Sequence, residues 1–149
     1  MNTPLGELTL TSTEKGLAAV DFGRRVPQGA IANLAANRTF IRQIEEYFQG
    51  QRTQFDFPLD FKGTEFQMAV WRELLQIPYG QTRTYGDIAK KLGRPGAARA
   101  VGMANHDNHL PIVVPCHRVV GHDGSLTGYA GGLHIKKQLL TIETRKLFL

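Results

Sequence analysis

The spacing of apolar residues changes once along this chain of 149 residues, near residue 60. Before that point, residues 5–11 and 17–22 have the composition of two strands on either side of a turn, which predicts a β-hairpin. Residues 37–48 repeat apolar side chains at helical spacing, and residues 54–59 alternate them as a final strand or an extended connector would. These elements predict a small α+β unit over residues 1–58, which at this size we expect to pack on its neighbour.

After residue 63 the apolar residues follow helical spacing instead. Thr64 is a suitable N-cap for one helix, and Thr84 is one for a second, shorter helix that Gly93 would end. A third helix follows a tight turn. Two short helices joined by a turn containing glycine have the spacing of a helix-turn-helix, although such pairs also occur as plain structural units. The chain is therefore predicted to be α+β, with a mostly helical domain over residues 59–149.

The positive charge of the chain is concentrated in this second part. The formal net charge is +5, yet residues 1–62 carry seven Lys or Arg against seven Asp or Glu, and the rest of the chain carries eleven against six. A basic domain beside a neutral one indicates a polyanionic partner, most simply nucleic acid. Charge alone leaves a solvated cationic face equally open.

Several classes of protein are excluded by composition. No run of apolar residues approaches the roughly 18 needed to cross a bilayer, and the N-terminus lacks the order of a secretory signal. The single cysteine cannot form an internal disulfide, which favours a reducing compartment. No CxxC, HxH or HExxH spacing occurs, so no metal site is predicted. We expect a cytoplasmic protein that binds neither a metal nor a cofactor.

The single cysteine lies in the apolar stretch LPIVVPCHRVV, residues 110–120. Residues 110–114 are predicted to form a buried strand that delivers Cys116 into a turn. His117 and Arg118 are candidates to favour its thiolate form, which is the nucleophile. Neighbouring side chains in an extended chain point apart, so a direct Cys–His pair would need a bent backbone or a bridging water. An inert buried cysteine is the alternative.

The third predicted helix is unusually bare, because Ala98, Ala100 and Gly102 give it little side-chain bulk. A thin helix favours insertion into the minor groove of DNA, with Arg99 as the probing side chain. A tightly packed core helix with Arg99 at its rim is the other interpretation. Near the end of the last predicted helix, over residues 133–145, Glu143 is either an acid that orients a histidine or a surface charge.

Taken together, these motifs resemble those of the O6-alkylguanine-DNA alkyltransferases, which repair DNA by direct reversal. The matching segments, in family order over residues 63–143, are GTEFQMAVW, IPYGQTRTYGDIA, AARAVGMANHDN, PCHRVVG, GYAGGL and Glu143. The resemblance implies a ribonuclease-H-like N-terminal domain followed by a winged helix-turn-helix-like domain. It also implies one irreversible transfer of an alkyl group from O6-alkylguanine, and from O4-alkylthymine, to the protein's own cysteine after minor-groove binding and base flipping.

The resemblance assigns roles to single residues. Cys116 would accept the alkyl group, His117 would act as its base through a water molecule, and Glu143 would hold the imidazole. Asn108 would brace the turn beside the cysteine. Tyr85 would help to push out the target nucleotide and would donate a proton to the departing guanine.

The DNA contacts and the base pocket are implied in the same way. Arg99 matches the arginine that fills the space left by the extruded nucleotide. The other expected DNA-binding residues are Ala98, Ala100, Gly102, Thr84 and Arg118. The expected walls of the base pocket are Tyr85, Val119, Tyr129, Ala130 and Gly131. The implied partner is double-stranded DNA, bound by a monomer that can act cooperatively, in the nucleoid of a bacterium or the nucleus of a eukaryote.

Three features depart from the family pattern. His109 stands where the family usually has proline, which loosens the turn before Pro111. Ala130 stands where some members carry a polar or larger residue, so the size range of accepted adducts is open. The first segment lacks the cysteines that bind zinc in some relatives, so no structural metal is implied.

The competing functions each conflict with a feature of the sequence. Alkyltransferase-like proteins, which bind damaged DNA without repairing it, replace the acceptor cysteine, whereas Cys116 is present here. A transcription regulator would explain the helix-turn-helix spacing but gives PCHR and Glu143 no role. A cysteine hydrolase would need an oxyanion loop and a His/Asn pair distant from the cysteine, which the sequence does not indicate.

Overall fold

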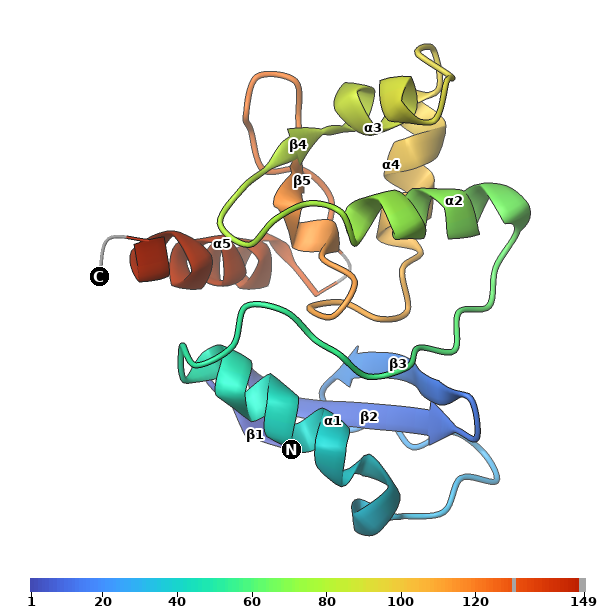
Figure 1. The fold of residues 1–149 in the computed structure, drawn as a ribbon, viewed down its shortest axis with the longest axis vertical. Helices are drawn as coiled ribbons and strands as arrows, with labels where there is room; N and C mark the ends of the chain where they lie inside the picture. The colour runs from blue at the N-terminus through green and yellow to red at the C-terminus, as the bar shows by residue number, and fades with distance from the viewer. Residues whose placement is uncertain (130, 148–149) are drawn as a thin grey trace. The chain divides into compact units, whose positions relative to one another are not determined.

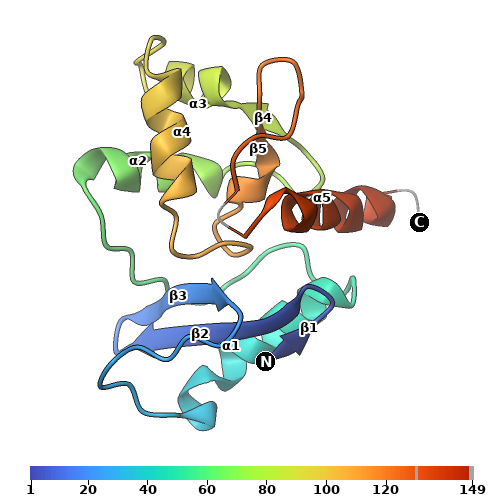
Figure 2. The same cartoon turned by 180° about the vertical axis from the view of Figure 1, so that it is seen from behind.

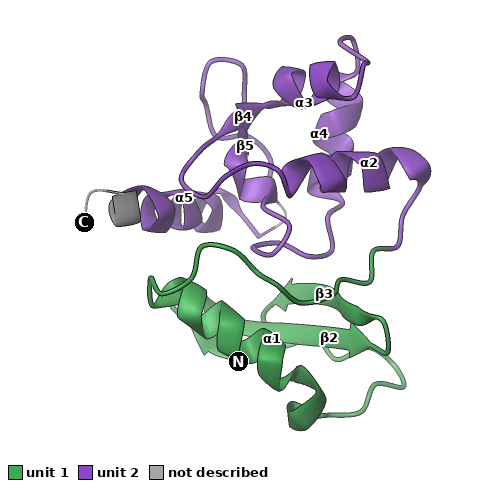
Figure 3. Ribbon diagram, in the orientation of Figure 1, with its two compact units in different colours: residues 1–61 green, residues 62–149 purple. Residues whose placement is uncertain are grey.

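The computed structural model describes residues 1–129 and 131–147, with side chains described as far as residue 144. The chain divides into two compact units, Met1–Phe61 and Lys62–Leu149 (Figure 3). Each unit has buried apolar side chains of its own. Within the described residues, no helix has both the length and the apolar character needed to cross a membrane.

The first unit is a three-stranded antiparallel sheet with one helix (Figures 1 and 2). Its strands, which lie in chain order, are β1 (Asn2–Thr3), β2 (Gly6–Thr13) and β3 (Gly16–Phe22). The hairpin predicted from the sequence is present as β2 and β3, in which Leu10 pairs with Val20. Residues 54–59 form an extended connector, and Leu59 makes a parallel bridge to Leu17.

The helix of this unit is α1 (Leu34–Phe48), which begins three residues before its predicted start. The earlier start follows from Asn33, whose side-chain oxygen accepts a hydrogen bond from the backbone of Ala36 at 2.9 Å and so caps the helix. The helix contributes Phe40 to the core, where its ring meets that of Phe57 edge-on with centroids 4.8 Å apart. This aromatic contact ties the extended connector to the helix.

The second unit contains the remaining helices and a small parallel sheet. Its elements are α2 (Glu65–Leu74), β4 (Arg83–Thr84), α3 (Tyr85–Lys91), α4 (Ala98–His106), the 3₁₀ helix η1 (Cys116–Arg118), β5 (Val119–Val120) and α5 (Leu133–Leu147). Thr64 and Thr84 are the N-caps of α2 and α3, as predicted, and both belong to complete capping boxes.

The predicted helix-turn-helix corresponds to α3 and α4. Gly93 lies just beyond α3 with φ of +73°, a left-handed conformation that favours glycine and ends the helix. Helix α4 is held against α2 by the indole of Trp71, which donates a hydrogen bond to the carbonyl of Ala104 at 2.9 Å. The pairing of β4 with β5 joins Thr84 to Val120, so Tyr85 begins α3 next to the strand that follows Cys116.

Residues 110–114 do not form the strand predicted from the sequence. They form a buried turn, in which the backbone N–H of Val114 donates to the carbonyl of Leu110 at 2.8 Å and Ile112 has a φ of +75°. Pro111 and Pro115 lack the N–H groups that a sheet ladder needs. These apolar residues are buried because the turn lies inside the protein. A run of apolar residues is equally compatible with a buried strand and with a buried turn, so the sequence pattern does not distinguish the two.

Candidate active site

Cys116 occupies the first position of η1 and is only 4% exposed. The chain bends sharply here, because the backbone N–H of Cys116 donates to the carbonyl of Val114 at 2.7 Å and that of Arg118 donates to the carbonyl of Pro115 at 3.0 Å. A bent backbone was one of the two conditions under which the sequence allows Cys116 and His117 to cooperate. The turn supplies it.

Two asparagines hold this bend from the side of α4. Asn108 accepts a hydrogen bond from the backbone of Leu110 at 3.0 Å and donates one to the carbonyl of Val114 at 2.9 Å, so it joins both ends of the buried turn. Asn105 donates to the carbonyl of Cys116 at 3.3 Å. The family resemblance implies a bracing role for Asn108, and these two hydrogen bonds are of the kind that this role requires. Asn105 was not among the predicted site residues.

Behind the cysteine, His117 and Glu143 form a buried pair. The imidazole Nε2 lies 2.7 Å from a carboxylate oxygen of Glu143, which reaches it from α5. The two side chains are 0% and 1% exposed, so Glu143 is not a surface charge, and its carboxylate lies where it can orient the imidazole. Arg118 completes the group, with two guanidinium nitrogens 2.8 and 3.0 Å from the two carboxylate oxygens.

The charges in this group decide which nitrogen of His117 carries a proton. Burial alone would raise the pKa of Glu143, but hydrogen bonds and positive charge from His117 and Arg118 hold it well below its usual range. Burial lowers the pKa of His117, and this outweighs the opposing effect of Glu143. The imidazole is therefore neutral near pH 7 and donates its Nε2–H to the ionised carboxylate. Its Nδ1 then carries a lone pair, and this buried atom has no hydrogen-bond partner among the described residues.

The thiol itself is not ionised at rest. Burial raises the pKa of Cys116 to about 11, although the Asn108 side chain and the charge of Lys136 act in the opposite direction. At pH 7 only about one molecule in 10⁴ would hold a thiolate. A nucleophilic role for Cys116 therefore needs a base that removes the proton during the reaction, and the Nδ1 lone pair of His117 is such a base.

Lys136 is a site residue that the sequence did not suggest. It lies on α5 with its side chain buried, and its ammonium group donates to the carbonyls of Val119 at 2.6 Å and Thr127 at 2.8 Å. It thereby links β5 to the segment over residues 121–132 that precedes α5 and contains five glycines, called the glycine-rich loop below. Burial lowers its pKa, and Cys116 opposes this. A lysine is rarely fully buried, so the sequence carries no signal for this position.

The structure describes four of the five residues predicted to wall the base pocket. The hydroxyl of Tyr85 lies 2.9 Å from that of Thr127, and Val119 is fully buried. Tyr129 is also buried, and burial together with the neighbouring Cys116 raises its pKa well above the usual value. Gly131 is half-buried. Ala130 lies outside the described residues.

The predicted DNA-contacting helix, α4, has one buried and one open side. Val101, Ala104 and Asn105 are buried, whereas Arg99 and Ala100 are exposed. The open side also includes the half-buried Ala98 and Gly102. At Gly102 an added Cβ would lie 3.8 Å from ring carbons of Tyr85, so this side of α4 passes close to the pocket wall. The small residues thus do not make α4 a helix that is buried all round. Thr84 uses its hydroxyl to cap α3.

Comparisons with known proteins agree along both units. Residues 65–145 match the DNA-binding domain model, and residues 1–61 the ribonuclease-like domain model, of 6-O-methylguanine DNA methyltransferase. The chain belongs to this family. A protein of Methanosarcina barkeri named methylated-DNA–protein-cysteine methyltransferase is 47% identical over 99% of this chain and 96% of its own length. One of the same name from Methanosarcina acetivorans is 50% identical over 95% of this chain and 94% of its own.

Solved structures of family members are also similar to this one. Mycobacterium tuberculosis OGT in complex with DNA has a TM-score of 0.91 at 44% identity and covers 98% of this chain and 91% of that chain. Atl1 of S. pombe in complex with damaged DNA containing O6-carboxymethylguanine has a TM-score of 0.50 at 35% identity, over 56% of this chain and 79% of that chain. The family and the fold predicted from the sequence, a ribonuclease-like domain before a helical DNA-binding domain, are confirmed.

Arg118 corrects one of the expectations that the family resemblance implied. It was expected among the DNA-binding residues, but it is only 7% exposed and faces inward. Besides its two bonds to Glu143, its guanidinium donates to the carbonyl of Ile77 at 2.8 Å. Three of the five N–H donors of this guanidinium are thereby engaged inside the protein. In this member of the alkyltransferase family, the Arg118 side chain bonds to Glu143 and to the carbonyl of Ile77 inside the protein, which does not favour the expected contact with DNA.

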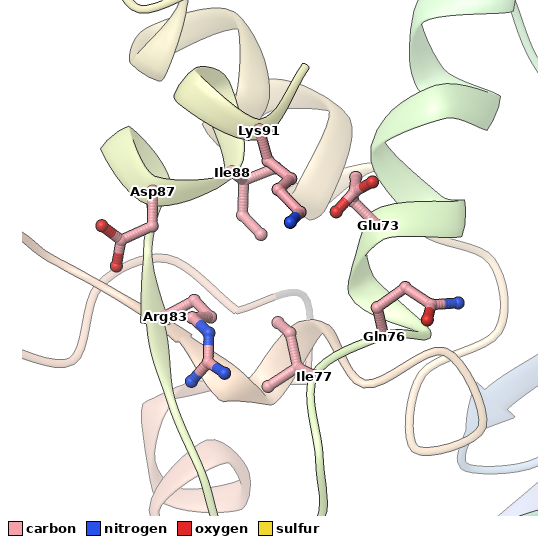
Figure 4. Close-up of a pocket in the computed structure, with 7 residues that line it drawn as sticks. All are labelled: Glu73, Gln76, Ile77, Arg83, Asp87, Ile88 and Lys91. Carbon is pink, nitrogen blue, oxygen red and sulfur yellow. The ribbon is translucent and has the colours of Figure 1, made fainter. Parts of the chain in front are cut away.

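A pocket of about 470 Å³ lies among α2, β4 and α3 (Figure 4). Charged side chains of both signs line it, with Glu73 on α2 facing Lys91 on α3 and Arg83 nearby. Ile77 and Ile88 supply its apolar lining. None of the residues expected to form the thiol site or the base pocket is among those that line it. We therefore do not assign it to the extruded base.

Proposed function

We propose that this chain repairs alkylated DNA by direct reversal, transferring the alkyl group of O6-alkylguanine to the sulfur of Cys116. One observation carries the proposal: in a member of the methyltransferase family, the bend at Cys116 adjoins a buried imidazole whose second nitrogen is held by an ionised carboxylate. Such an arrangement activates a nucleophile through a base that a third group orients. O4-alkylthymine is a second substrate in this proposal.

Activation and transfer follow from the protonation states. The thiol of Cys116 gives its proton, through one water molecule, to Nδ1 of His117, and the imidazolium that forms is stabilised by Glu143. Sulfur then forms a bond to the alkyl carbon while the bond from that carbon to O6 breaks, and its electron pair stays with guanine. Tyr85 donates a proton to the departing base. The thioether product has no return path in water, so each molecule acts once.

Access to the lesion requires DNA to be deformed. O6 of guanine is inside the duplex, so the nucleotide must be rotated out at a cost of about a few kcal/mol. The thin, open side of α4 enters the minor groove, and the exposed Arg99 takes the place of the extruded nucleotide. The basic unit holds phosphates and does not read sequence. The protein acts as a monomer that binds double-stranded DNA cooperatively, in the cytoplasm or the nucleoid where the DNA lies.

A lesion sensor is the second candidate, because the similar S. pombe structure holds damaged DNA. The residue that accepts the alkyl group distinguishes a protein that repairs the lesion from one that only binds it. A sensor needs no nucleophile, no base and no carboxylate behind that base, whereas Cys116, His117 and Glu143 are all in place here. The active-site arrangement therefore favours transfer over recognition alone.

The direct test is the intact mass of the protein after incubation with a duplex that contains O6-methylguanine. We expect one added methyl group, located on Cys116 by peptide mapping, and no more than one lesion repaired per molecule. Cys116→Ser should bind the same duplex and remain unmodified. An unmodified wild-type protein with bound but unrepaired DNA would instead establish the sensor.

A further inference from the structure

The hydroxyl groups of Tyr85 and Thr127 lie 2.9 Å apart, although the two residues are 42 positions apart in the chain. Tyr85 begins α3, and Thr127 belongs to the glycine-rich loop before α5. The proposed function uses the Tyr85 hydroxyl as a proton donor and gives Thr127 no role. The contact therefore raises the question of what the threonine does for the tyrosine.

Tyr85 is fixed from its own side of the contact. Thr84 and Asp87 form the capping box that starts α3, with hydrogen bonds of 2.9 and 3.0 Å between them. The pairing of Thr84 with Val120 sets the same point of the backbone against β5. The ring also passes close to Gly102 on α4. These anchors restrict where the phenol oxygen can lie.

Thr127 is fixed independently of Tyr85. Its carbonyl accepts a hydrogen bond from the ammonium of Lys136 at 2.8 Å, and the same ammonium donates to the carbonyl of Val119 at 2.6 Å. Because the Lys136 side chain is buried, water does not compete freely for these bonds. The loop is thereby held to the strand that follows Cys116, and the Thr127 hydroxyl is presented to Tyr85 from a rigid support.

From this geometry we infer that Thr127 is a positioning residue for the leaving-group step, an inference that rests on the proposed function. Before DNA binds, the phenol is the stronger acid of the two and donates to the threonine oxygen, which holds it in place. Once the phenol donates to the base, the hydroxyl of Thr127 turns and donates into the phenol oxygen. A hydroxyl can do both because it rotates about its C–O bond and has one donor and two acceptor sites.

The proton balance of this step is simple. As the bond from the alkyl carbon to O6 breaks, the proton of Tyr85 moves to a ring nitrogen of guanine, and the phenol oxygen gains negative charge. The hydrogen bond from Thr127 is strongest at that moment, because charge-assisted bonds are about twice as strong as neutral ones. The bond therefore stabilises the transition state more than the ground state. Solvent returns a proton to Tyr85 after the base leaves.

The test is a double-mutant cycle on the rate of methyl transfer from saturating duplex to Cys116, measured in a single turnover. Thr127→Val removes the hydroxyl and keeps the shape of the side chain. We expect it to slow transfer about tenfold, the worth of one such hydrogen bond, with the Kd for the duplex unchanged. Thr127→Ser should restore the rate. In the Tyr85→Phe background, Thr127→Val should slow transfer no further, since the oxygen it serves is gone.

Two outcomes would overturn the inference. One is a Thr127→Val rate equal to that of the wild type. The other is an equal loss with and without the Tyr85 hydroxyl, because a loss of general structure would not depend on that oxygen. Thr141→Val is the matched control, since Thr141 lies on the exposed side of α5 and bonds only locally, to the carbonyl of Lys137. Failure of the wild-type protein to accept a methyl group would refute the proposed function instead.

Discussion

At the scale of single residues, the site depends on how three buried charged or titratable side chains share protons. Arg118 supplies the positive charge among them, with two guanidinium nitrogens 2.8 and 3.0 Å from the carboxylate oxygens of Glu143. It keeps Glu143 ionised, and the ionised carboxylate keeps the Nε2–H of His117 in place. Arg118 therefore acts indirectly on Nδ1 of His117: because the proton of the imidazole stays on Nε2, Nδ1 keeps its lone pair. Sequence alone placed Arg118 beside the cysteine but could not show that its side chain turns inward.

Replacing Arg118 by methionine tests this dependence. The change keeps most of the side-chain length but leaves the carboxylate of Glu143 buried without its two hydrogen bonds from the guanidinium. Breaking a buried ion pair on one side typically costs about 3–5 kcal/mol, so we expect a loss of that order in the free energy of unfolding, measured with denaturant. Methyl transfer should also slow, since Glu143 orients the base less well. Lys137→Met, an exposed change on α5, is the control and should alter neither quantity. Unchanged unfolding in Arg118→Met would show that the ion pair contributes nothing.

At the scale of helices and strands, an element could be predicted from sequence where the residues that determine it are close together in the chain. The caps of α2 and α3 are encoded within four residues, so Thr64 and Thr84 could be recognised from sequence. The buried turn over residues 110–114 could not be recognised from sequence, because its apolar residues have the composition of a strand. The hydrogen bonds that hold it as a turn come from the side chain of Asn108. The pairing of β4 with β5 joins segments 36 positions apart, which no local pattern contains.

The same distinction applies to the candidate site. Cys116, His117 and Glu143 could be named because motif order and family resemblance carry them across the chain. The role of Lys136 could not be predicted, since its ammonium bonds to the backbone carbonyls of Val119 and Thr127, which only the fold brings together. Positions whose role comes from tertiary contacts with backbone atoms are thus the ones that sequence reasoning misses.

Helix α4 carries the prediction that belongs to this scale. Arg99 stands on its open side, and in the proposed function it matters only when a nucleotide has left the stack. Arg99→Ala should therefore slow methyl transfer from duplex DNA by about tenfold or more while leaving transfer from the free base O6-methylguanine nearly unchanged. Arg72→Ala, an exposed arginine on α2, should affect neither reaction. Equal losses on duplex and free base in Arg99→Ala would remove the role in extrusion.

At the scale of the whole molecule, charge and chemistry are concentrated in one of the two units. Residues 1–61 carry six Lys or Arg and seven Asp or Glu, a net charge of −1, and the rest of the chain carries twelve against six, a net charge of +6. Every residue predicted for catalysis or DNA contact also lies after residue 61. The reactive unit therefore has to fold around buried polar groups, and its stability should depend on pH through those groups.

Cys116 gives the clearest form of this dependence. Burial raises the pKa of this thiol to about 11 in the folded protein, above the 9.0 of a solvent-exposed cysteine. A raised folded pKa means that the contribution to stability is fully present below pH 9 and is lost as the pH rises through about 11, because the unfolded chain releases the proton first. The loss amounts to about 2–3 kcal/mol. Tyr129 and Lys136 also contribute to the pH dependence, because burial raises the pKa of the first and lowers that of the second, so the total is a sum of several groups.

The contribution of the thiol is isolated by comparison with Cys116→Ala. Free energies of unfolding should be measured with denaturant for both proteins between about pH 7 and about pH 11. We expect the wild type to lose stability more steeply than the variant above pH 9, with the gap between the two curves changing by the amount that the thiol contributes. A gap that stays constant over this range would mean that Cys116 ionises as easily in the folded protein as in the unfolded chain. In that case about 1% of the thiol would be ionised at pH 7, roughly a hundredfold more than a pKa of about 11 allows, and transfer would depend less on His117 as a base.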